Sequence, residues 1–460
     1  MSAISRELTF ALQNHPNALT PGGNVLLCVS ETDITNNDLK EDLNDFFDGT
    51  LEVEEMAVED LIEHSEKEEK LNDSRHFDGI ICSNIFTETN IVEDRRKVAA
   101  VLGVLLRMLR NEGAVLIIRE NLEHFSAQLI ADLTKFVDVL ATKCQSHTLG
   151  FRLYGMCQVQ NSIFAHSNFL DVYWTLTKSA EVRLYDDKLA TFREFLDKTQ
   201  YTEDNVASYE WIFGKDFISP GGIEENRRVL RRFRRLRPGQ KMLDIGVGIG
   251  GGARQAAREF GLQVLGCDLS SNMIQHAFER NQRDKDHRVE YQIADAMVYR
   301  YEPNAYDIVF SRDCIQHIQD TKALFRNIYT WLKPGGQLLL TMYGKGLGVL
   351  QPKFHEYVRK RQYMLKTLDE YRETAHGAGF TNIFTENMTP RLRTILEMER
   401  SRAIAHGDEF VQRFGKALYD KLLEGWMDKL QFIDDDNQNW LMLRAEKPVH
   451  SHAYLTEAGA

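Results

Sequence analysis

The second half of the chain alternates between short apolar runs and longer amphipathic stretches. Apolar runs of this length predict strands, and apolar residues spaced three or four positions apart predict helices. The predicted strands cover residues 241–246, 262–270, 289–296, 305–314 and 334–343, and the predicted helices cover 251–261, 270–283 and 321–333. This alternation favours an α/β fold with a parallel, doubly wound sheet, in which ligands bind beyond the carboxyl ends of the strands.

A weaker copy of the same pattern occurs in the first half. "HFDGIICSNIF" at 76–86 parallels "AYDIVFSRDCI" at 305–315, and "LLRMLRNEGAVLIIRE" at 105–120 parallels "IYTWLKPGGQLLLTMY" at 328–343. In both halves an aromatic residue and an aspartate open an apolar strand, and a later helix turns through glycine into another strand. The first half is therefore predicted to be Rossmann-like, with an unrelated α/β domain as the alternative.

One part of the pattern is missing from the first half. After the predicted strand "NVLLCV", residues 30–42 read "SETDITNNDLKED", where a nucleotide-binding domain has a glycine loop. These side chains would crowd a nucleotide, because close approach of the backbone requires glycine. We predict a degenerate domain without a cofactor over 1–190, a complete domain over 191–450 and a tail over 451–460.

Composition adds limits to this picture. The chain has 460 residues, 43% of them hydrophobic and 27% charged, which is enough for two or three domain cores. The longest apolar run, 98–106, is too short to span a bilayer, and the N-terminal sequence lacks the layout of a signal peptide. Six scattered cysteines without C-x-x-C spacing indicate reduced thiols, so we expect a cytoplasmic protein without membrane insertion and without a metal.

The net charge of −12 is concentrated in residues 31–73, where acidic residues greatly outnumber basic ones. An acidic chain is a poor partner for nucleic acid, which we do not expect it to bind. The exception is "RRVLRRFRRLR" at 227–237, whose apolar residues have helical spacing. We predict an amphipathic helix there with a solvated basic face.

The candidate chemistry begins at Gly246, Gly248 and Gly251, which form a G-x-G-x-x-G loop after the strand at 241–246. Taken alone, this loop also suits dinucleotide enzymes. Three aspartates give more information, because Asp244 precedes the loop, Asp268 ends the next strand and Asp295 follows the third. Carboxylates at these points suit ribose hydroxyls and an ammonium group, as in S-adenosylmethionine, although each aspartate could instead be a helix cap or turn residue.

Longer motifs make the comparison specific. "LDIGVGIGGGA" at 243–253, "GCDLSSNMI" at 266–274, "YDIVFSRDCIQHI" at 306–318 and "WLKPGGQLLLTMY" at 331–343 resemble the ordered motifs of class I S-adenosylmethionine-dependent methyltransferases. "QYTEDNVASYEWIFGKDFISPGG" at 200–222, "SRDCIQHI" and "EYVRKRQYML" resemble the phosphoethanolamine N-methyltransferases of plants, nematodes and malaria parasites. The resemblance covers about 199–447, and the first half resembles only the degenerate partner domain of two-domain members.

A substrate of this family carries a phosphate at one end and an amine at the other. For the phosphate, Tyr357, Arg361 and Tyr363 offer a guanidinium fork and hydroxyl donors on one short stretch, although surface arginines and core tyrosines would give the same pattern. The amine must lose a proton before it can attack a methyl group. His317, four residues after Asp313 and expected on the same helix face, is the candidate base, and Asp313 could hold the ammonium form.

The resemblance implies the remaining roles. A histidine at the position of His317 pairs with a tyrosine at that of Tyr201, and together they gate the site. The cofactor is expected to contact Tyr201, Ile218, Ser219, Asp244, Gly246, Gly248, Asp268, Leu269, Asp295, Ala296 and Arg312. The substrate is expected to contact Gln200, Tyr209, Arg312, Asp313, Tyr343, Tyr357, Arg361, Tyr363 and Lys429, the last resting only on "GWMDK" in a variable region.

The predicted function is S-adenosylmethionine-dependent methylation of phosphomonomethylethanolamine and phosphodimethylethanolamine to phosphocholine, because two-domain relatives with only a C-terminal catalytic domain resemble enzymes of the later steps. Phosphoethanolamine itself stays open as a substrate, since pocket volume sets the methyl count. The alternatives are a methyltransferase for a sterol or quinone, a nicotinamide-dependent oxidoreductase and a non-catalytic cofactor-binding regulator. We expect a monomer or weak dimer.

Overall fold

The computed structural model describes residues 22–29, 40, 41, 43, 49–66, 76–89, 95–110, 113–122, 134, 141–144, 147–159, 170–179 and 192–449. The chain divides into two compact units. The first comprises residues 1–196 together with 292–300, and the second comprises 197–291 and 301–460. The predicted domain boundary at residue 190 lies shortly before this division, and the predicted tail 451–460 lies outside the described residues.

The second unit is built around one twisted sheet. Its strands are β8 (Lys241–Ile245), β9 (Gln263–Asp268), β10 (Val289–Ala294), β11 (Tyr306–Arg312), β12 (Leu332–Lys345), β13 (Thr381–Asn387) and β14 (Gln438–Glu446). They lie in the order β10-β9-β8-β11-β12-β14-β13. β9, β11 and β12 continue β8 in parallel, and β14 runs antiparallel to both β12 and β13. The strand order reverses between β8 and β11, which is where doubly wound sheets bind ligands, so the predicted fold class is confirmed.

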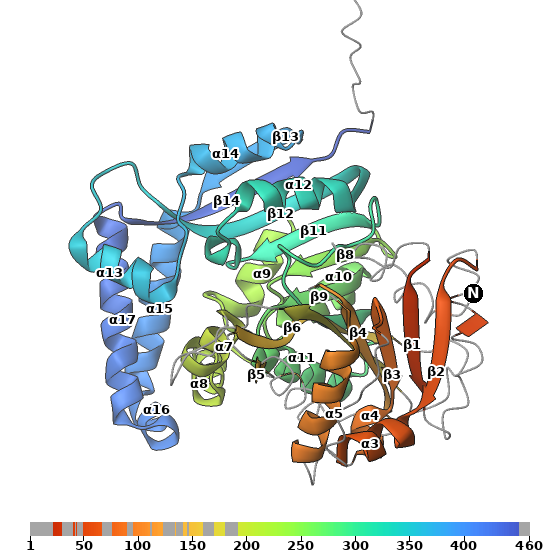
Figure 1. Ribbon diagram of the computed structural model, residues 1–460. Helices are drawn as coiled ribbons and strands as arrows, with labels where there is room; N and C mark the ends of the chain where they lie inside the picture. Colours follow the sequence, from red (N-terminus) through yellow and green to blue (C-terminus); the bar gives the residue numbers. More distant parts are fainter. Residues whose placement is uncertain are drawn as a thin grey trace, which may run out of the picture. The chain divides into compact units, whose positions relative to one another are not determined.

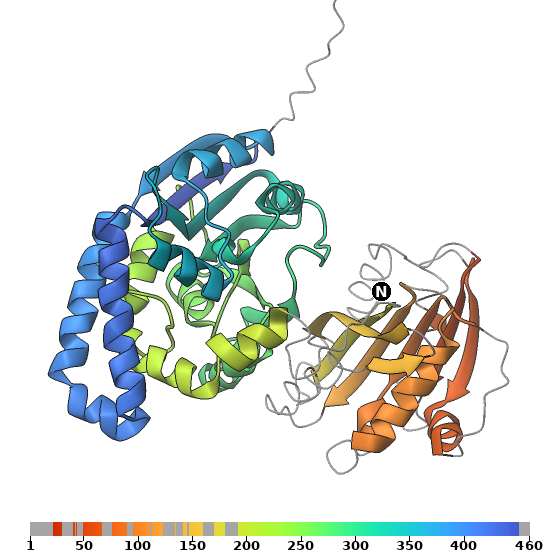
Figure 2. The same cartoon turned by 60° about the vertical axis from the view of Figure 1, so that its left-hand side comes forward.

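Helices lie above and below this sheet (Figure 1). They are the π-helical turn η2 (Leu196–Gln200), α8 (Glu203–Phe213), α9 (Gly222–Leu230), α10 (Gly251–Phe260), α11 (Ser271–Asp284), the 3-10 turn η3 (Ile315–His317), α12 (Thr321–Trp331), α13 (Pro352–Arg361), α14 (Leu368–Gly377), α15 (Thr389–Ala405), α16 (Gly407–Phe414) and α17 (Lys416–Asp434). α9 packs against α10, and α12 against α14. The last three helices, drawn in blue in Figure 2, pack together, and α15 also contacts α8.

The sequence signals for helix ends work as expected at α10 and α11. α10 ends at Gly261, which adopts the left-handed conformation common at helix C-termini. Ser270 precedes α11, and its side chain accepts a hydrogen bond from the backbone N of Met273. The predicted basic helix at 227–237 is wrong beyond Leu230, where α9 ends. Tertiary contacts replace the helix there, because Phe233 is buried and packs near Phe310.

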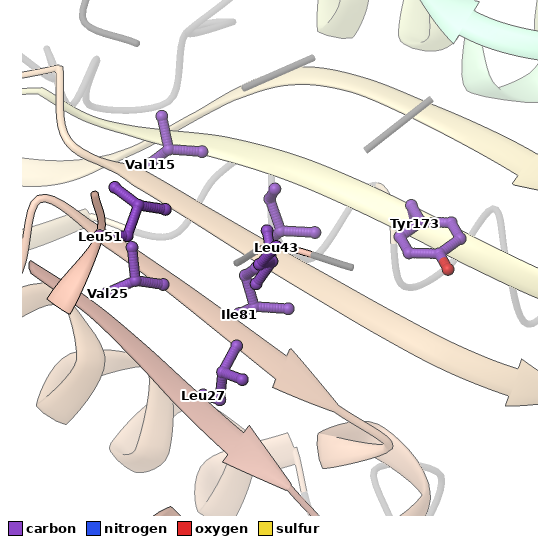
Figure 3. Close-up of a cluster of buried hydrophobic side chains, with 8 residues drawn as sticks. Val25, Leu27, Leu43, Leu51, Ile81, Val115 and Tyr173 are labelled. Atoms are coloured by element: carbon purple, nitrogen blue, oxygen red, sulfur yellow. The ribbon is translucent and has the colours of Figure 1, made fainter. Parts of the chain in front are cut away.

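The first unit is a smaller sheet with its own core. Its elements are β1 (Asn24–Val29), β2 (Glu52–Ala57), α3 (Val58–Glu66), β3 (Gly79–Ser83), α4 (Ile85–Glu88), α5 (Arg95–Met108), β4 (Val115–Leu122), β5 (Ala141–Cys144), β6 (His147–Val159), β7 (Leu170–Ser179) and α7 (Phe192–Phe195). The sheet order is β2-β1-β3-β4-β7-β6, with β5 also paired to β6. Figure 3 shows the buried cluster that joins these strands, with Val25, Leu27, Ile81 and Val115 labelled.

This order repeats that of the second unit. β1, β2, β3 and β4 are parallel, and β7 runs antiparallel to both β4 and β6, as β14 does between β12 and β13. Side chains repeat as well. Asp78 Oδ2 accepts a hydrogen bond from the backbone N of Asn24 at 3.0 Å, and Asp307 Oδ2 accepts one from the backbone N of Lys241 at 2.9 Å. An aspartate at the equivalent position thus fixes the start of the central strand in each unit.

A second contact, between a lysine and a backbone carbonyl, is also repeated in the two units. Lys178 Nζ donates to the carbonyl of Leu109 at 2.6 Å, and Lys447 Nζ donates to the carbonyl of Leu332 at 2.7 Å. Lys178 lies near the end of β7 and Lys447 directly follows β14, and in both units the carbonyl belongs to the residue after the preceding helix. These paired contacts support the internal copy that the sequence echo predicts, and they make an unrelated α/β domain a poor description of the first unit.

The copy lacks the residues that are predicted to bind a cofactor in the second unit. Counting from the first residues of β1 and β8 pairs Leu27 with Asp244 and Val29 with Gly246. A carboxylate is thus replaced by a buried apolar side chain, and a glycine by a branched residue. Most of the segment 30–42, where we predict that the glycine loop was lost, lies outside the described residues.

Other sequence expectations concern cysteines and membranes. Free thiols are found at Cys28, Cys82, Cys157, Cys267 and Cys314. Burial raises the pKa of Cys267 to about 12, so its thiol stays protonated. Within the described ranges, none of the helices has the length and apolar character that crossing a bilayer requires.

Candidate active site

The glycine loop between β8 and α10 is closely packed. Gly246 has a φ of 76°, and a Cβ added there would lie 2.4 Å from both Cβ and Sγ of Cys314. Gly248 has a φ of 57°, and an added Cβ would lie 3.2 Å from Ile218. Both glycines therefore satisfy a backbone and a steric requirement at once. The loop brings the predicted cofactor residues Gly246, Gly248 and Ile218 together at the strand-order reversal.

Two carboxylates flank this loop. Asp268, at the end of β9, accepts hydrogen bonds from the backbone N of Gly248 and of Ser270, each at 2.9 Å. Burial raises the pKa of Asp268 to about 6 despite these bonds. Asp244 in β8 is buried, and its pKa rises to about 8 because of burial and the nearby charge of Asp268, while Arg312 acts in the opposite direction. The pair is therefore placed to receive a cationic or hydroxyl-bearing ligand.

Arg312, at the end of β11, has its terminal nitrogens occupied. Nη2 donates to the carbonyl of Pro220 at 2.5 Å, and Nη1 donates to Gly222 at 3.3 Å and to Asn226 Oδ1 at 3.4 Å. The guanidinium thus holds the turn that follows Ile218 and Ser219. This arrangement supports the predicted role of Arg312 beside the cofactor, and its predicted contact with a phosphate stays a prediction.

Glu399 of α15 holds the same turn from the other side, and the sequence did not indicate it. Its Oε1 accepts a hydrogen bond from the backbone N of Gly221 at 2.7 Å. Burial raises the pKa of Glu399 to about 7, while the Gly221 amide and the charges of Arg402, Lys429 and Arg312 act to lower it. The turn that Glu399 binds lies far from α15 in the sequence. A contact of this kind leaves no periodic pattern of apolar residues from which it could be predicted.

Replacing Glu399 with glutamine is expected to stabilise the protein at alkaline pH. The raised pKa means that the folded state favours the protonated acid. The contribution of Glu399 to the free energy of unfolding is therefore fully present below the ordinary pKa of 4.5 and is lost as pH rises through about 7. Glutamine keeps an oxygen for Gly221 and carries no charge, which offsets a cost of about 3 kcal/mol at pH 8. The Tm difference from wild type should shrink as pH falls toward 4.5. Glu397→Gln, exposed on the same helix, is the control, and an unchanged Tm at pH 8 would contradict the prediction.

Aromatic side chains surround the predicted phosphate ligand Arg361, at the end of α13. Its guanidinium carbon lies 5.8 Å from the centre of the Tyr357 ring. Tyr363 packs against Tyr357 and Tyr343, with ring centres 5.9 Å and 6.2 Å apart. Burial acts to lower the pKa of Arg361, but the surrounding phenols outweigh it and raise the pKa, so the guanidinium stays charged. A half-buried cation among phenol side chains is suited to an oxyanion.

Tyr201 and Tyr209 belong to the same environment. Burial, followed by the charge of Asp268, raises the pKa of the Tyr201 phenol, and Arg361 acts to lower it. The charges of Asp268 and Arg361 thus both act on the Tyr201 phenol, which stays a neutral hydrogen-bond donor. Gln200 Nε2 lies 3.5 Å from the carbonyl of Arg361, to which it donates, and Tyr209 contributes to the raised pKa of Arg361.

Asp313 and His317 differ from the sequence prediction in one respect. They do not share a helix face, because Asp313 has a φ of 57° and precedes the three-residue turn η3, which ends at His317. Asp313 Oδ1 accepts hydrogen bonds from Thr341 Oγ1 at 2.9 Å and from Trp440 Nε1 at 2.7 Å. Its Oδ2 is buried without a hydrogen bond, and Arg312 Nε lies 3.8 Å away. The left-handed backbone turns this carboxylate away from the helical position that spacing alone predicts.

His317 is half-buried, and its ring packs edge-on against Tyr363 with centres 4.8 Å apart. Burial, and then the charge of Arg361, lowers the pKa of His317 to about 4. This value lies below the near-neutral pKa of a free imidazole. The imidazole is neutral at physiological pH, which leaves it able to accept a hydrogen bond or a proton.

The remaining predicted residues are less closely tied to this cluster. Leu269 follows Asp268 directly, and the charge of Lys429 on α17 acts on Glu399. Asp295 and Ala296 lie within 292–300, which groups with the first unit, and Asp295 Oδ1 accepts a hydrogen bond from the backbone N of Met297 at 2.8 Å. Across the described ranges, His, Cys, Asp and Glu side chains form no group of three or more that could hold a metal ion.

Comparison with known proteins identifies the family of this chain. The profile described as "Phosphoethanolamine N-methyltransferase 2 N-terminal" matches residues 2–182, and that of a methyltransferase domain matches 243–340. Phosphoethanolamine N-methyltransferase 2 of Caenorhabditis elegans is 46% identical over 386 residues, 83% of this chain and 86% of that protein. The phosphoethanolamine N-methyltransferase of Plasmodium falciparum is 31% identical over 57% of this chain and 98% of its own.

A solved structure matches over almost the whole length. Phosphoethanolamine N-methyltransferase 2 of Haemonchus contortus, in complex with phosphomonomethylethanolamine and S-adenosylhomocysteine, has a TM-score of 0.87 and 42% identity. The match covers 97% of this chain and 100% of that one. Sequence and fold agree with one another, and we conclude that the chain belongs to the phosphoethanolamine N-methyltransferase family.

Proposed function

We propose that this chain methylates the nitrogen of phosphomonomethylethanolamine and phosphodimethylethanolamine, giving phosphocholine, with S-adenosylmethionine as methyl donor. The observation that carries the proposal is the half-buried, charged Arg361 beside the cluster of Tyr357, Tyr363 and Tyr343, with His317 packed against Tyr363. A phosphate needs such a cation, and the amine at the other end of a small substrate needs the neutral imidazole. The relative from Haemonchus contortus was solved with phosphomonomethylethanolamine.

The residues near the glycine loop fit the donor. Gly246 and Gly248 leave space that a Cβ would fill, Asp268 offers carboxylate oxygens to hydroxyl groups, and Asp244 is suited to an ammonium group. When bound, S-adenosylmethionine supplies a methyl group on a cationic sulfur. Arg312 and Glu399 keep the turn after Ser219 in place beside this loop, which orders the residues predicted to cover the donor.

The chain's own residues also meet the demands of the amine. Asp313 is fixed through Oδ1 by Thr341 and Trp440, so that Oδ2 remains as a buried acceptor for a cationic nitrogen. His317 takes the proton that the nitrogen must lose before it attacks. Tyr201, held as a neutral phenol, orders the amine. Positioning by these groups supplies much of the rate, because aligned reactants gain a large effective concentration.

The test is incubation with labelled S-adenosylmethionine and each phospho-base in turn. We expect label in products of the monomethyl and dimethyl substrates, and little or none in the product of phosphoethanolamine. Efficient labelling of phosphoethanolamine would extend the activity to the first step. Labelling only of a sterol or quinone, or calorimetric binding of NADH in place of S-adenosylmethionine, would overturn the proposal.

We also place the protein in the cytoplasm as a monomer or weak dimer that binds neither nucleic acid nor membranes by insertion. The free thiols of the described cysteines suit a reducing compartment. Light scattering at micromolar concentration tests the oligomeric state, and a stable higher oligomer would contradict it.

A further inference from the structure

Asp197 is a buried carboxylate in η2 that the proposed reaction does not use. Both of its oxygens face the N-terminus of α11. Ser270 Oγ donates to Oδ1 at 2.5 Å, and Ser271 Oγ donates to Oδ2. The backbone N of Ser271 and of Asn272 add longer hydrogen bonds, each at 3.3 Å. A residue far away in the sequence thus acts as an extra cap for a fourteen-residue helix, whose amide groups favour a negative charge.

The backbone around Asp197 is attached to the same helix. Asn272 Nδ2 donates to the carbonyl of Asp197 at 3.1 Å and to that of Tyr201 at 2.8 Å. Asn205 Nδ2 donates to the carbonyls of Thr199 and Gln200, each at 3.3 Å. The whole segment 197–201 is therefore fixed by side chains, and a π-helical turn needs such support because its own hydrogen bonding is unfavourable.

The two ends of this network lead to different parts of the candidate site. Gln200, at one end, is a predicted substrate residue that contacts Arg361, and the adjacent Tyr201 is predicted to contact the cofactor and to gate the site. At the other end, Ser270 donates its backbone N to Asp268, the predicted ribose ligand. Asp197 joins the two ends, since it contacts Ser270 directly and lies in the same turn as Gln200.

We infer that Asp197 is a positioning residue that couples the cofactor site to the phosphate site by fixing residues 197–201 on the N-terminus of α11. The inference rests on the proposed function for its substrate. Its physical basis is geometric: the phenol of Tyr201 can be held at one place only if its backbone is anchored, and Asp197 supplies the anchor with the greatest number of hydrogen bonds in the segment.

The experiment uses the full chain with Asp197→Asn, which keeps the size of the side chain and removes its charge. We expect the Kd for S-adenosylhomocysteine, measured by calorimetry, and the KM for phosphomonomethylethanolamine each to rise about tenfold, as the loss of a buried charged cap permits. Amide hydrogen exchange should also become faster in 197–202. Thr367→Ala is the matched control, because it removes the N-cap of α14, which holds none of the predicted site residues.

Ser271→Ala gives a second route to the same contact if Asp197→Asn lowers stability. The double variant Asp197→Asn with Ser271→Ala should show no larger rise in Kd or KM than Asp197→Asn alone, because the two substitutions remove the same interaction. A rise in Kd with the KM within twofold of wild type would reduce Asp197 to a helix cap and overturn the coupling. If wild type binds S-adenosylhomocysteine but methylates no phospho-base, the proposed function fails, while the calorimetric and exchange results still test the role of Asp197 at the cofactor site and in the segment.

Discussion

Arg361→Ala is expected to raise the KM for phosphomonomethylethanolamine about a hundredfold or more, with the affinity for S-adenosylhomocysteine unchanged. The guanidinium lies half-buried among tyrosine rings and stays charged. Without it the phosphate would lose a cationic partner, because the phenols of Tyr357 and Tyr363 offer hydrogen bonds but no positive charge. Steady-state kinetics with calorimetry measure the two effects separately.

Two variants make this result specific. Arg359→Ala removes an exposed arginine from the same helix and should leave both constants near their wild-type values. Arg361→Lys keeps the charge but loses the planar fork, so it should recover only part of the affinity. A KM for Arg361→Ala within threefold of wild type would favour an apolar acceptor such as a sterol or quinone.

The central parallel strands of the second unit could be predicted from its sequence. Apolar runs bounded by glycine and polar residues gave β8, β9 and β11 close to their observed bounds, because buried parallel strands must be continuously apolar. The echo between the two halves was also readable, since Asp78 and Asp307 fix the same strand in each unit. A repeated fold needs the same few side chains to start its central strand.

The parts that could not be predicted depend on contacts between distant segments. Leu230 ends α9 although the apolar spacing continues, because Phe233 is buried elsewhere. Asp313 adopts a left-handed backbone that spacing does not reveal. Glu399 and Asp197 each bind a segment that lies far from them in the sequence. A single sequence shows the residue type at such positions but not the distant segment that the residue contacts.

His317→Asn is expected to lower kcat by about a hundredfold or more without changing the affinity for S-adenosylhomocysteine, as the loss of a general base does. The loss should be larger for the more basic amine substrates, since these hold their proton more tightly. Asparagine keeps a polar side chain but loses the ring contact with Tyr363, so the Tm of the variant is measured together with its kcat. Equal kcat values for variant and wild type from pH 6 to 9 would exclude the role.

The pKa of His317 sets a further condition on this role. At about 4 the imidazole is neutral above pH 5, so its protonation gives the free enzyme no loss of activity between pH 5 and 7. An imidazole with this pKa is also a weak base for an alkylammonium, whose pKa is about 10.

Part of the lowering of the His317 pKa comes from the charge of Arg361, and a bound phosphate dianion would offset that charge. We therefore expect phosphocholine to raise the pKa of His317, measured by NMR titration of the ring, and choline, which has no phosphate, to leave it unchanged. An equal pKa with both ligands would show that the phosphate does not prepare the base, and the proton would then have to leave by another group.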